Sequence, residues 1–157
     1  RGGRAERRRA PGGAGQIRDH RPMNRAVLWD SSAVLALLDA DDSDHEVAKT
    51  TAHAIANEAR PSFMTNHLEV ETHALLLRKL GRMVAVEWLL RGRMPVVRVS
   101  PREERRAREL LANYDDKDWS LCDALSFAVI EARGVEAAFS FDRHFRQFGR
   151  CRVLGIG

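Results

Sequence analysis

The sequence has few cysteines, few lysines and no long apolar run. Its two cysteines, Cys122 and Cys151, are too few and too far apart for a disulfide framework or a zinc site. We interpret both as small buried side chains of a protein in a reducing compartment. No apolar stretch has the length of a membrane span or the composition of a signal peptide. We therefore expect a soluble, cytoplasmic protein with no membrane partner.

Other absences argue against particular classes of function. The only lysines are Lys49, Lys79 and Lys117, and none of them ends a strand, as a receiver domain would require. A phosphatase of the haloacid dehalogenase type would carry its second carboxylate where the chain has Ser32. The acidic loop at residues 39–44 lacks the central glycine and distal glutamate of an EF-hand. The histidines do not have the spacing of a zinc protease.

The length and charge distribution indicate one folded domain with a basic extension. A chain of 157 residues with 44% hydrophobic content can bury a single core. The net charge is +4, but residues 1–22 hold seven arginines against Glu6 and Asp19, which leaves −1 for the remainder. This stretch is also rich in glycine and has little to bury, so we expect a disordered extension at 1–22, either an RNA-binding arm or a solvated tail, and a folded domain at 23–157.

Strands and helices are predicted to alternate along the domain. The expected strands are 27–30, 62–65, 95–99, 135–141 and 151–154. The expected helices are 33–38, about 45–59, 67–80 with Asn66 as its cap, 82–91, 101–113 and 121–133, and residues 143–149 are expected to form a turn. The short links between these segments favour a parallel α/β sheet with helices on both faces.

Two of the predicted strands end in aspartate. Asp30 follows the apolar residues 27–29, and Asp142 follows the strand 135–141. Because parallel strands place their carboxyl ends at one edge of a sheet, the two carboxylates should lie at the same edge, where open α/β folds bind ligands. Asp30 also precedes a helix, so a purely structural role as an N-cap is an equal alternative.

Further acids lie on two predicted helices. Asp123 stands near the start of an apolar helix, where it forms a capping box with Ser120 or accompanies a metal ion that offsets the cost of burying its charge. The helix 67–80 carries both Glu69 and Glu71, and helical periodicity does not choose between them.

Four segments, in this order, combine these acids with hydroxyl and amide side chains. They are Asp30-Ser-Ser32, Thr65-Asn66 with Glu71 five positions on, Ser120-Leu-Cys-Asp123-Ala-Leu-Ser-Phe-Ala, and Phe139-Ser-Phe-Asp142-Arg-His-Phe with Phe148-Gly149 behind it. On these segments the chain from Met23 onward resembles the PIN-domain ribonucleases, and most closely the VapC toxins of bacterial toxin–antitoxin pairs. The resemblance implies a PIN-like three-layer α/β/α sandwich with a central, mainly parallel sheet.

The same resemblance implies an acidic metal site and selects Glu71 over Glu69. The catalytic residues and metal ligands would be Asp30, Glu71, Asp123 and Asp142. The secondary members would be Ser32 and Ser140 as hydrogen-bond partners of the carboxylates, Asn66 as a group that orients Glu71, and Asp118 as a nearby acid. The sequence departs from the family pattern at Cys122, where a threonine is common, and in its basic extension.

The implied activity is that of a metal-dependent endoribonuclease, the toxin of a type II toxin–antitoxin system. Carboxylate ligands select Mg²⁺ or Mn²⁺, which can hold a phosphodiester and activate water. Basic residues that follow Asp142 are candidates for phosphate binding, namely Arg143, His144, Arg146, Arg150 and Arg152. The implied partners are an RNA substrate, a small antitoxin and a second copy of the chain. The alternative is a non-catalytic PIN-like domain that binds RNA or a protein.

Overall fold

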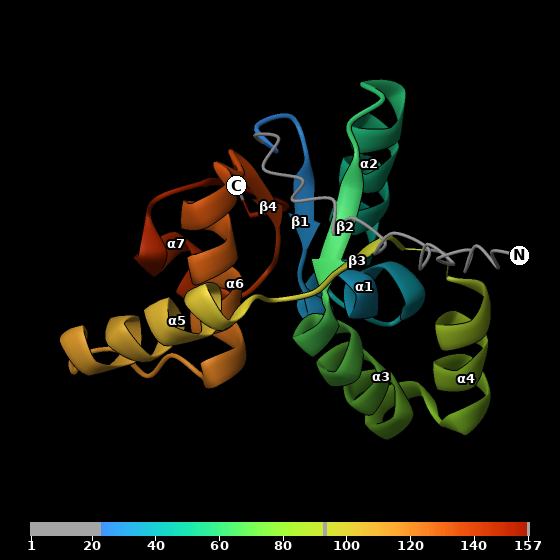
Figure 1. The fold of residues 1–157 in the computed structure, drawn as a ribbon. Coiled ribbons are helices and arrows are strands. Elements are labelled where there is room, and N and C mark those ends of the chain that lie inside the picture. Colours follow the sequence, from blue (N-terminus) through green and yellow to red (C-terminus); the bar gives the residue numbers. More distant parts are fainter. Residues whose placement is uncertain (1–22, 93, 157) are drawn as a thin grey trace, which may run out of the picture.

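The computed structural model describes residues 23–92 and 94–156. Within these residues, one five-stranded sheet is surrounded by seven helices (Figure 1). The strands are β1 (Val27–Trp29), β2 (Ser62–Thr65), β3 (Val96–Val97), β4 (Ala137–Phe139) and β5 (Arg152–Leu154). The helices are α1 (Ser31–Leu38), α2 (His45–Asn57), α3 (Asn66–Leu80), α4 (Arg82–Arg91), α5 (Pro101–Asn113), α6 (Leu121–Arg133) and α7 (Arg143–Phe148). The extension predicted for residues 1–22 lies outside the described residues.

The sheet has the strand order β3-β2-β1-β4-β5, and every neighbouring pair is parallel. β1 and β4 are therefore central neighbours, in a register that places Trp29 opposite Phe139. The residues that follow these two strands, Asp30 and Ser140, consequently emerge side by side at the carboxyl edge of the sheet. The backbone amide of Asp30 donates to the carbonyl of Phe139 at 3.0 Å, which extends the pairing to the first acid.

Helices cover both faces of the sheet, as predicted. Figure 1 shows α5, α6 and α7 on one side and α1, α2 and α4 on the other, while α3 continues from β2 past the carboxyl ends of the strands. α3 contacts α1, α4 and α6, so it connects the two helical layers at this edge. Among the described residues, no helix is both long and apolar enough to cross a membrane.

The core consists of strands that are buried on both faces. Val27, Leu28 and Phe139 are fully buried, and Trp29 packs edge-on against Phe139 with ring centroids 4.8 Å apart. Because helices cover both sides of the sheet, these strands are continuously apolar and do not alternate between apolar and polar residues. A sheet anchored in this way gives the acids at its edge a rigid base.

Two local predictions were wrong. Residues 143–148 form the short helix α7 and not a turn, because Asp142 caps its first amides and Phe145 and Phe148, three residues apart, are both buried. The cap of α3 is Thr65, whose hydroxyl accepts from the amide of Leu68 at 3.1 Å, and Asn66 is the first helical residue. The strands predicted at 95–99 and 135–141 are also shorter, at two and three residues.

Candidate active site

Asp30 combines the two roles that the sequence left open. It is the N-cap of α1, accepting a hydrogen bond from the amide of Ser32 at 3.2 Å, and its side chain is buried at the edge of the sheet. The hydroxyl of Ser32 donates to the same carboxylate, and the hydroxyl of Ser140 donates to it at 2.9 Å. The cap therefore holds the carboxylate in one orientation.

The environment of Asp30 disfavours its charge. Burial is the main cause that raises the pKa of Asp30, to about 6, and the nearby carboxylate of Glu71 raises it further. The hydrogen bonds from Ser32 and Ser140 act in the opposite direction and do not compensate. A cation at this edge of the sheet would offset both the lost hydration of the Asp30 carboxylate and its repulsion by Glu71.

Glu71 reaches the same edge from α3. Its Oε2 accepts a hydrogen bond from the Ser31 hydroxyl at 2.9 Å and lies 3.6 Å from the Cys122 sulfur. Burial raises the pKa of the Cys122 thiol well above its usual range, and the charges of Glu71, Asp30 and Asp123 raise it further, which places this thiol among the three acids. The other candidate, Glu69, lines a separate cavity with Met64 and Trp88, about 150 Å³ in volume.

Asp123 and Asp142 converge with His144. Asp123 closes a reciprocal capping box with Ser120, in which the Ser120 amide donates to Asp123 Oδ2 at 2.8 Å. Asp142 caps α7 by accepting from the His144 amide at 2.8 Å. One ligand atom from each of Asp123, Asp142 and His144 lies within 4.8 Å of the other two. Asp123 therefore both forms the capping box and lies beside a second acid.

Ser140 joins the two halves of this acidic site. Its hydroxyl donates to Asp30 and accepts from the amide of Asp142 at 3.0 Å, so one side chain contacts both strand-end aspartates. The Ser32 hydroxyl makes a second link, because it accepts from the amide of Phe141 at 3.0 Å. The carboxyl ends of β1 and β4 are thus cross-linked by two serines.

Two of the predicted secondary residues lie at the border of the site. Asp118 is largely exposed, and its carboxylate pairs with Arg143 and with His144, whose Nε2 lies 3.1 Å away. The side-chain oxygen of Asn66 accepts from the amide of Val99 at 2.9 Å. Asn66 thereby fastens the segment after β3 to the start of α3, while Ser31 and Cys122 are the groups that contact Glu71.

Aromatic packing positions α7 and the residues at its start. Phe148 stacks on Phe127 of α6 with ring centroids 4.2 Å apart and an angle of 6° between the planes, and Phe145 packs edge-on against the same ring. Trp119 also packs edge-on against Phe127, with ring centroids 5.0 Å apart. Because α6 carries Asp123, this cluster fixes Asp142 and His144 relative to that acid.

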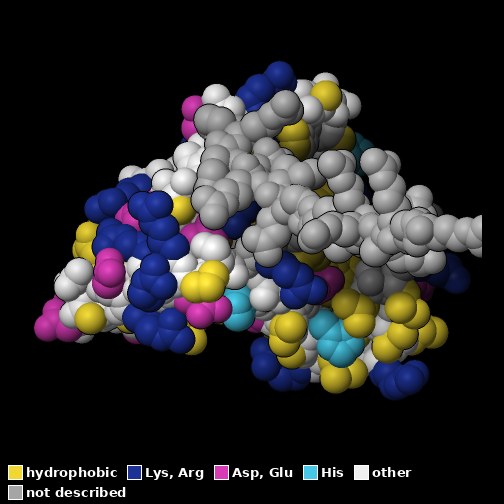
Figure 2. All heavy atoms as spheres, in the orientation of Figure 1, with side chains coloured by type: hydrophobic (Ala, Val, Ile, Leu, Met, Phe, Trp, Pro, Cys, Tyr) yellow, Lys and Arg dark blue, Asp and Glu magenta, His cyan; other side chains and the backbone are white. Residues whose placement is uncertain are grey.

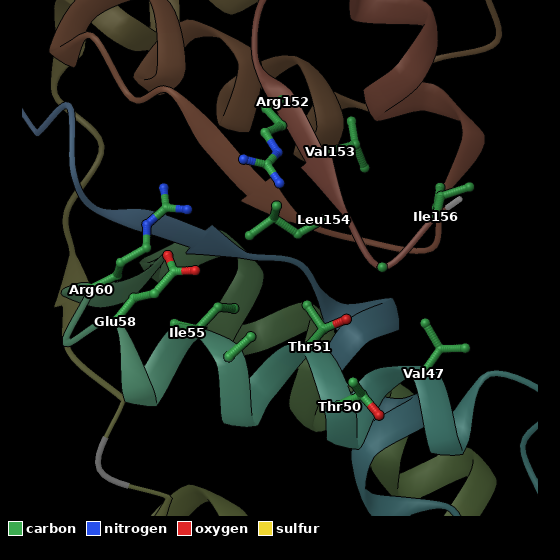
Figure 3. Close-up of a pocket in the computed structure, with 12 residues that line it drawn as sticks. Val47, Thr50, Thr51, Ile55, Glu58, Arg60, Arg152, Val153, Leu154 and Ile156 are labelled. Carbon is green, nitrogen blue, oxygen red and sulfur yellow. The ribbon is translucent and has the colours of Figure 1, made fainter.

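The basic residues that follow Asp142 do not form one group. Arg143 pairs with Asp118, and Arg150 pairs with Glu131 at 2.6 Å, so both charges already have acidic partners. Arg152 lines a different feature, a groove of about 370 Å³ between α2 and β5 (Figure 3). Figure 3 shows apolar side chains such as Ile55 and Leu154 along this groove, and none of the predicted site residues lines it.

Sequence reasoning missed three residues of this site. Ser31 was not named as a site residue, Cys122 was interpreted as a small core side chain, and His144 was considered only as a phosphate contact. The available signal was their position directly beside an acid in the chain, one or two residues from Asp30, Asp123 or Asp142. Such a position does not reveal which acid the side chain will contact.

The donor set fits a divalent cation. Asp123, Asp142 and His144 offer ligand atoms within 4.8 Å of one another, and Ser140 connects Asp142 to Asp30. Carboxylate oxygens are the ligands that hard divalent cations prefer. Burial is the main cause of the raised pKa of Asp30 and the charge of Glu71 adds to it, so a nearby cation would favour the charged carboxylate.

The chain belongs to the PIN domain family, whose sequence profile it matches over residues 27–150. It is similar to the 23S rRNA-specific endonuclease VapC20 of Mycobacterium tuberculosis, with 34% identity over 130 residues, or 81% of this chain and 97% of that protein. These matches confirm the family that the four sequence segments indicated.

Solved structures agree with this assignment. The crystal structure of Mycobacterium tuberculosis VapC20, described as a sarcin-ricin loop cleaving toxin, matches with a TM-score of 0.69 and 31% identity over 82% of this chain and 98% of that one. FitAcB from Neisseria gonorrhoeae matches with a TM-score of 0.59 at 15% identity over 82% of this chain and 96% of that one, which supports the fold alone. The PIN-like α/β/α fold predicted from the sequence is therefore confirmed.

Proposed function

We propose that this chain is a divalent-metal-dependent endoribonuclease and the toxin of a type II toxin–antitoxin pair. The observation that supports the proposal is a chain of contacts between acids in a PIN-family chain: Ser140 contacts both Asp30 and Asp142, Asp142 lies beside Asp123, and the charge of Glu71 acts on Asp30. Its 34% identity to a named rRNA endonuclease extends along nearly the whole of that protein.

The four acids would hold Mg²⁺ or Mn²⁺, which when bound neutralises charge on the phosphodiester and makes the attacking water more acidic. Asp30 is fixed for this role by Ser32 and Ser140, and Glu71 by Ser31. By holding the ion in place, these carboxylates would position it against the scissile phosphate, and no side chain would act as a covalent nucleophile. The Cys122 thiol, whose pKa is raised by burial and by the acids, stays protonated.

The proposed substrate is structured ribosomal RNA. The relative VapC20 is named as specific for 23S rRNA and as cleaving the sarcin-ricin loop. The surface around α5 offers positive charge for an RNA backbone: Figure 2 shows Lys and Arg side chains gathered over this helix, where Arg102 and Arg105 are exposed.

The proposed protein partners are a small antitoxin and a second copy of the chain. The helical hairpin formed by α3 and α4 exposes five large apolar side chains, namely Val70, Leu77, Met83, Leu89 and Leu90. Figure 2 shows hydrophobic side chains gathered over this hairpin. An apolar patch of this kind is typical of a protein interface.

Cleavage assays test the activity. Purified protein with Mg²⁺ or Mn²⁺ would be incubated with ribosomes and with an isolated sarcin-ricin loop oligonucleotide, beside Asp30→Asn and the matched surface control Asp41→Asn. We expect cleavage by the wild type and the control, at least a 100-fold loss in Asp30→Asn, and no cleavage in EDTA.

Equal cleavage by the wild type and Asp30→Asn would overturn the assignment of the site. If neither cuts any RNA, although both bind it, the chain is a non-catalytic PIN-like binding domain. Cleavage of other RNAs but not of the ribosomal loop would leave the nuclease in place and overturn the substrate.

A further inference from the structure

The two ring nitrogens of His144 contact three carboxylates. Its Nδ1 is 3.1 Å from Asp123 Oδ2 and 3.4 Å from Asp142 Oδ1, and its Nε2 is 3.1 Å from Asp118 Oδ1. The side chain is only 14% exposed, and its ring is fixed by the α7 backbone and by these contacts. One ring nitrogen therefore faces two carboxylates of the acidic site, and the other faces an acid outside it.

This arrangement matches the way in which proteins present histidine to a metal. A ligating imidazole directs one nitrogen to the ion and donates its other N–H to a carboxylate, which fixes the tautomer and the ring orientation. Asp118 is that carboxylate here: its own amide, Arg143 and His144 keep its pKa below the usual range, so it is a charged acceptor for Nε2. When Nε2 carries the hydrogen and donates it in a hydrogen bond to Asp118, Nδ1 has a lone pair that points towards Asp123 and Asp142.

The distances also fit a shared ion. Ligand atoms about 2.1 Å from one octahedral ion lie about 3 Å from their neighbours. Nδ1 and the two carboxylate oxygens, at 3.1 and 3.4 Å, have this spacing. In the tautomer that carries its hydrogen on Nε2, the Nδ1 lone pair faces two carboxylates and is repelled unless a cation lies between them.

We propose that His144 is a nitrogen ligand of the metal site, completing it beside Asp123 and Asp142, and that Asp118 is the positioning residue that orients the ring. This inference rests on the proposed metal-dependent function. Imidazole favours Mn²⁺ and other transition metals, whereas Mg²⁺ prefers an all-oxygen set. His144 thereby biases the site of this chain towards Mn²⁺.

The experiment measures binding of Mn²⁺ and Mg²⁺ to the whole protein by calorimetry, with no RNA present. We expect Mn²⁺ to bind at least about tenfold more tightly than Mg²⁺, and His144→Ala to weaken Mn²⁺ at least about tenfold while it changes Mg²⁺ less. Asp118→Asn should weaken Mn²⁺ by a smaller factor. His53→Ala, which removes an exposed histidine of α2, is the matched control and should bind as the wild type does.

Electron spin echo spectroscopy of the Mn²⁺-loaded wild type gives a readout that does not depend on any variant folding. We expect a directly bound ¹⁴N nucleus, which shifts to the ¹⁵N pattern after labelling with ¹⁵N-histidine and disappears in His144→Ala. Bound Mn²⁺ without nitrogen coupling, together with unchanged or tighter binding by His144→Ala, would overturn the proposal and leave the ring as an ion-pair partner only. Failure of the wild type to bind either ion would instead overturn the metal dependence of the proposed function.

Discussion

Single residues of this site serve the fold and the chemistry at once. Asp30 caps α1 and also carries a buried charge that the protein does not neutralise by itself. The hydrogen bonds that it accepts from Ser32 and Ser140 hold its geometry but do not offset the loss of hydration. The metal-free protein is therefore less stable than its packing alone would allow.

Asp30→Asn should stabilise the metal-free protein at neutral pH. The pKa of Asp30 is raised from 3.8 to about 6, so wild-type stability falls as the pH rises through this interval, when the folded carboxyl must ionise. The neutral amide avoids this loss and keeps the cap. We expect a gain of about 1–3 kcal/mol in the free energy of unfolding at pH 8 in EDTA, and little gain at pH 4. Urea titrations at both pH values measure it, and an equal effect at both would contradict the assigned shift.

Ser140→Ala should weaken metal binding and leave the protein folded. The hydroxyl donates to Asp30 and accepts from the amide of Asp142, so its removal frees both strand-end acids. Loss of a residue that orients ligands lowers metal affinity about 10–100-fold. Calorimetry with Mn²⁺ checks this, with Ser43→Ala in the exposed loop before α2 as the control. Unchanged affinity would show that the acids hold their positions without the serine.

At the scale of elements, α5 and α6 are joined by an ion pair whose carboxylate, Glu103, is buried. Arg133 Nε donates to Glu103 Oε1 at 2.7 Å, and Glu103 also closes the capping box of α5 by accepting from the Ser100 amide. Burial opposes the charge of Glu103, but the hydrogen bonds from Arg133 and Ser100 prevail and hold its pKa below 4.5. This pair connects the end of the helix that carries Asp123 to the start of its neighbour.

Arg133→Ala should be strongly destabilising. It leaves the Glu103 carboxylate buried without its partner, a loss for which about 2–4 kcal/mol is expected at pH 7. Since the pKa of Glu103 is lowered, the contribution of the pair is present above pH 4.5 and is lost as the pH falls through the folded-state value. Thermal unfolding measures the change. The control Arg108→Ala removes only an exposed contact with Glu104 and should cost about 0.5 kcal/mol or less, so similar losses in both would contradict the role of burial.

The sequence predicted elements wherever local signals were strong. Ser100, Pro101 and Glu103 mark the start of α5, and Gly81 separates α3 from α4 as expected. Residues 143–148 were missed as a helix because six residues are too short for a periodic pattern. Their helical form depends on the packing of Phe145 and Phe148 against α6, which is a tertiary contact.

The site was predictable only in part for the same reason. Parallel strands ending in Asp30 and Asp142 already placed two acids at one edge. The choice between Glu69 and Glu71 depends on the angle at which α3 passes the sheet, and periodicity along the helix carries no information about that angle. The position of His144 depends on the aromatic stack that orients α7, so no local pattern indicated its contacts with Asp123 and Asp118.

At the scale of the whole molecule, the acids and an exposed apolar surface both lie on the side of the carboxyl edge of the sheet. The carboxyl edge collects the acids, while the hairpin of α3 and α4 that extends from it presents an apolar surface to solvent (Figure 2). The helix α3 therefore carries Glu71 of the site and also forms part of the proposed interface.

The proposed homodimer should depend on this hairpin. Light scattering should give a mass near twice the 17.7 kDa of one chain, and the double variant Met83→Glu/Leu90→Glu should give the monomer, because it places charges on side chains that are 80% and 76% exposed. Leu38→Glu, at an exposed apolar position on α1, is the control and should remain dimeric. A monomeric wild type that binds its antitoxin through the hairpin would assign this surface to the antitoxin instead.

Two acids of the site, Asp30 and Asp142, are helix N-caps, and this has a consequence for how the protein can lose activity. Asparagine caps helices about as well as aspartate, so a change of Asp to Asn at either position removes a negative charge while the helix start is retained. A substitution can therefore abolish the activity without unfolding the protein. We expect a copy disarmed in this way still to bind the proposed antitoxin, and thereby to leave less of it for the active copies.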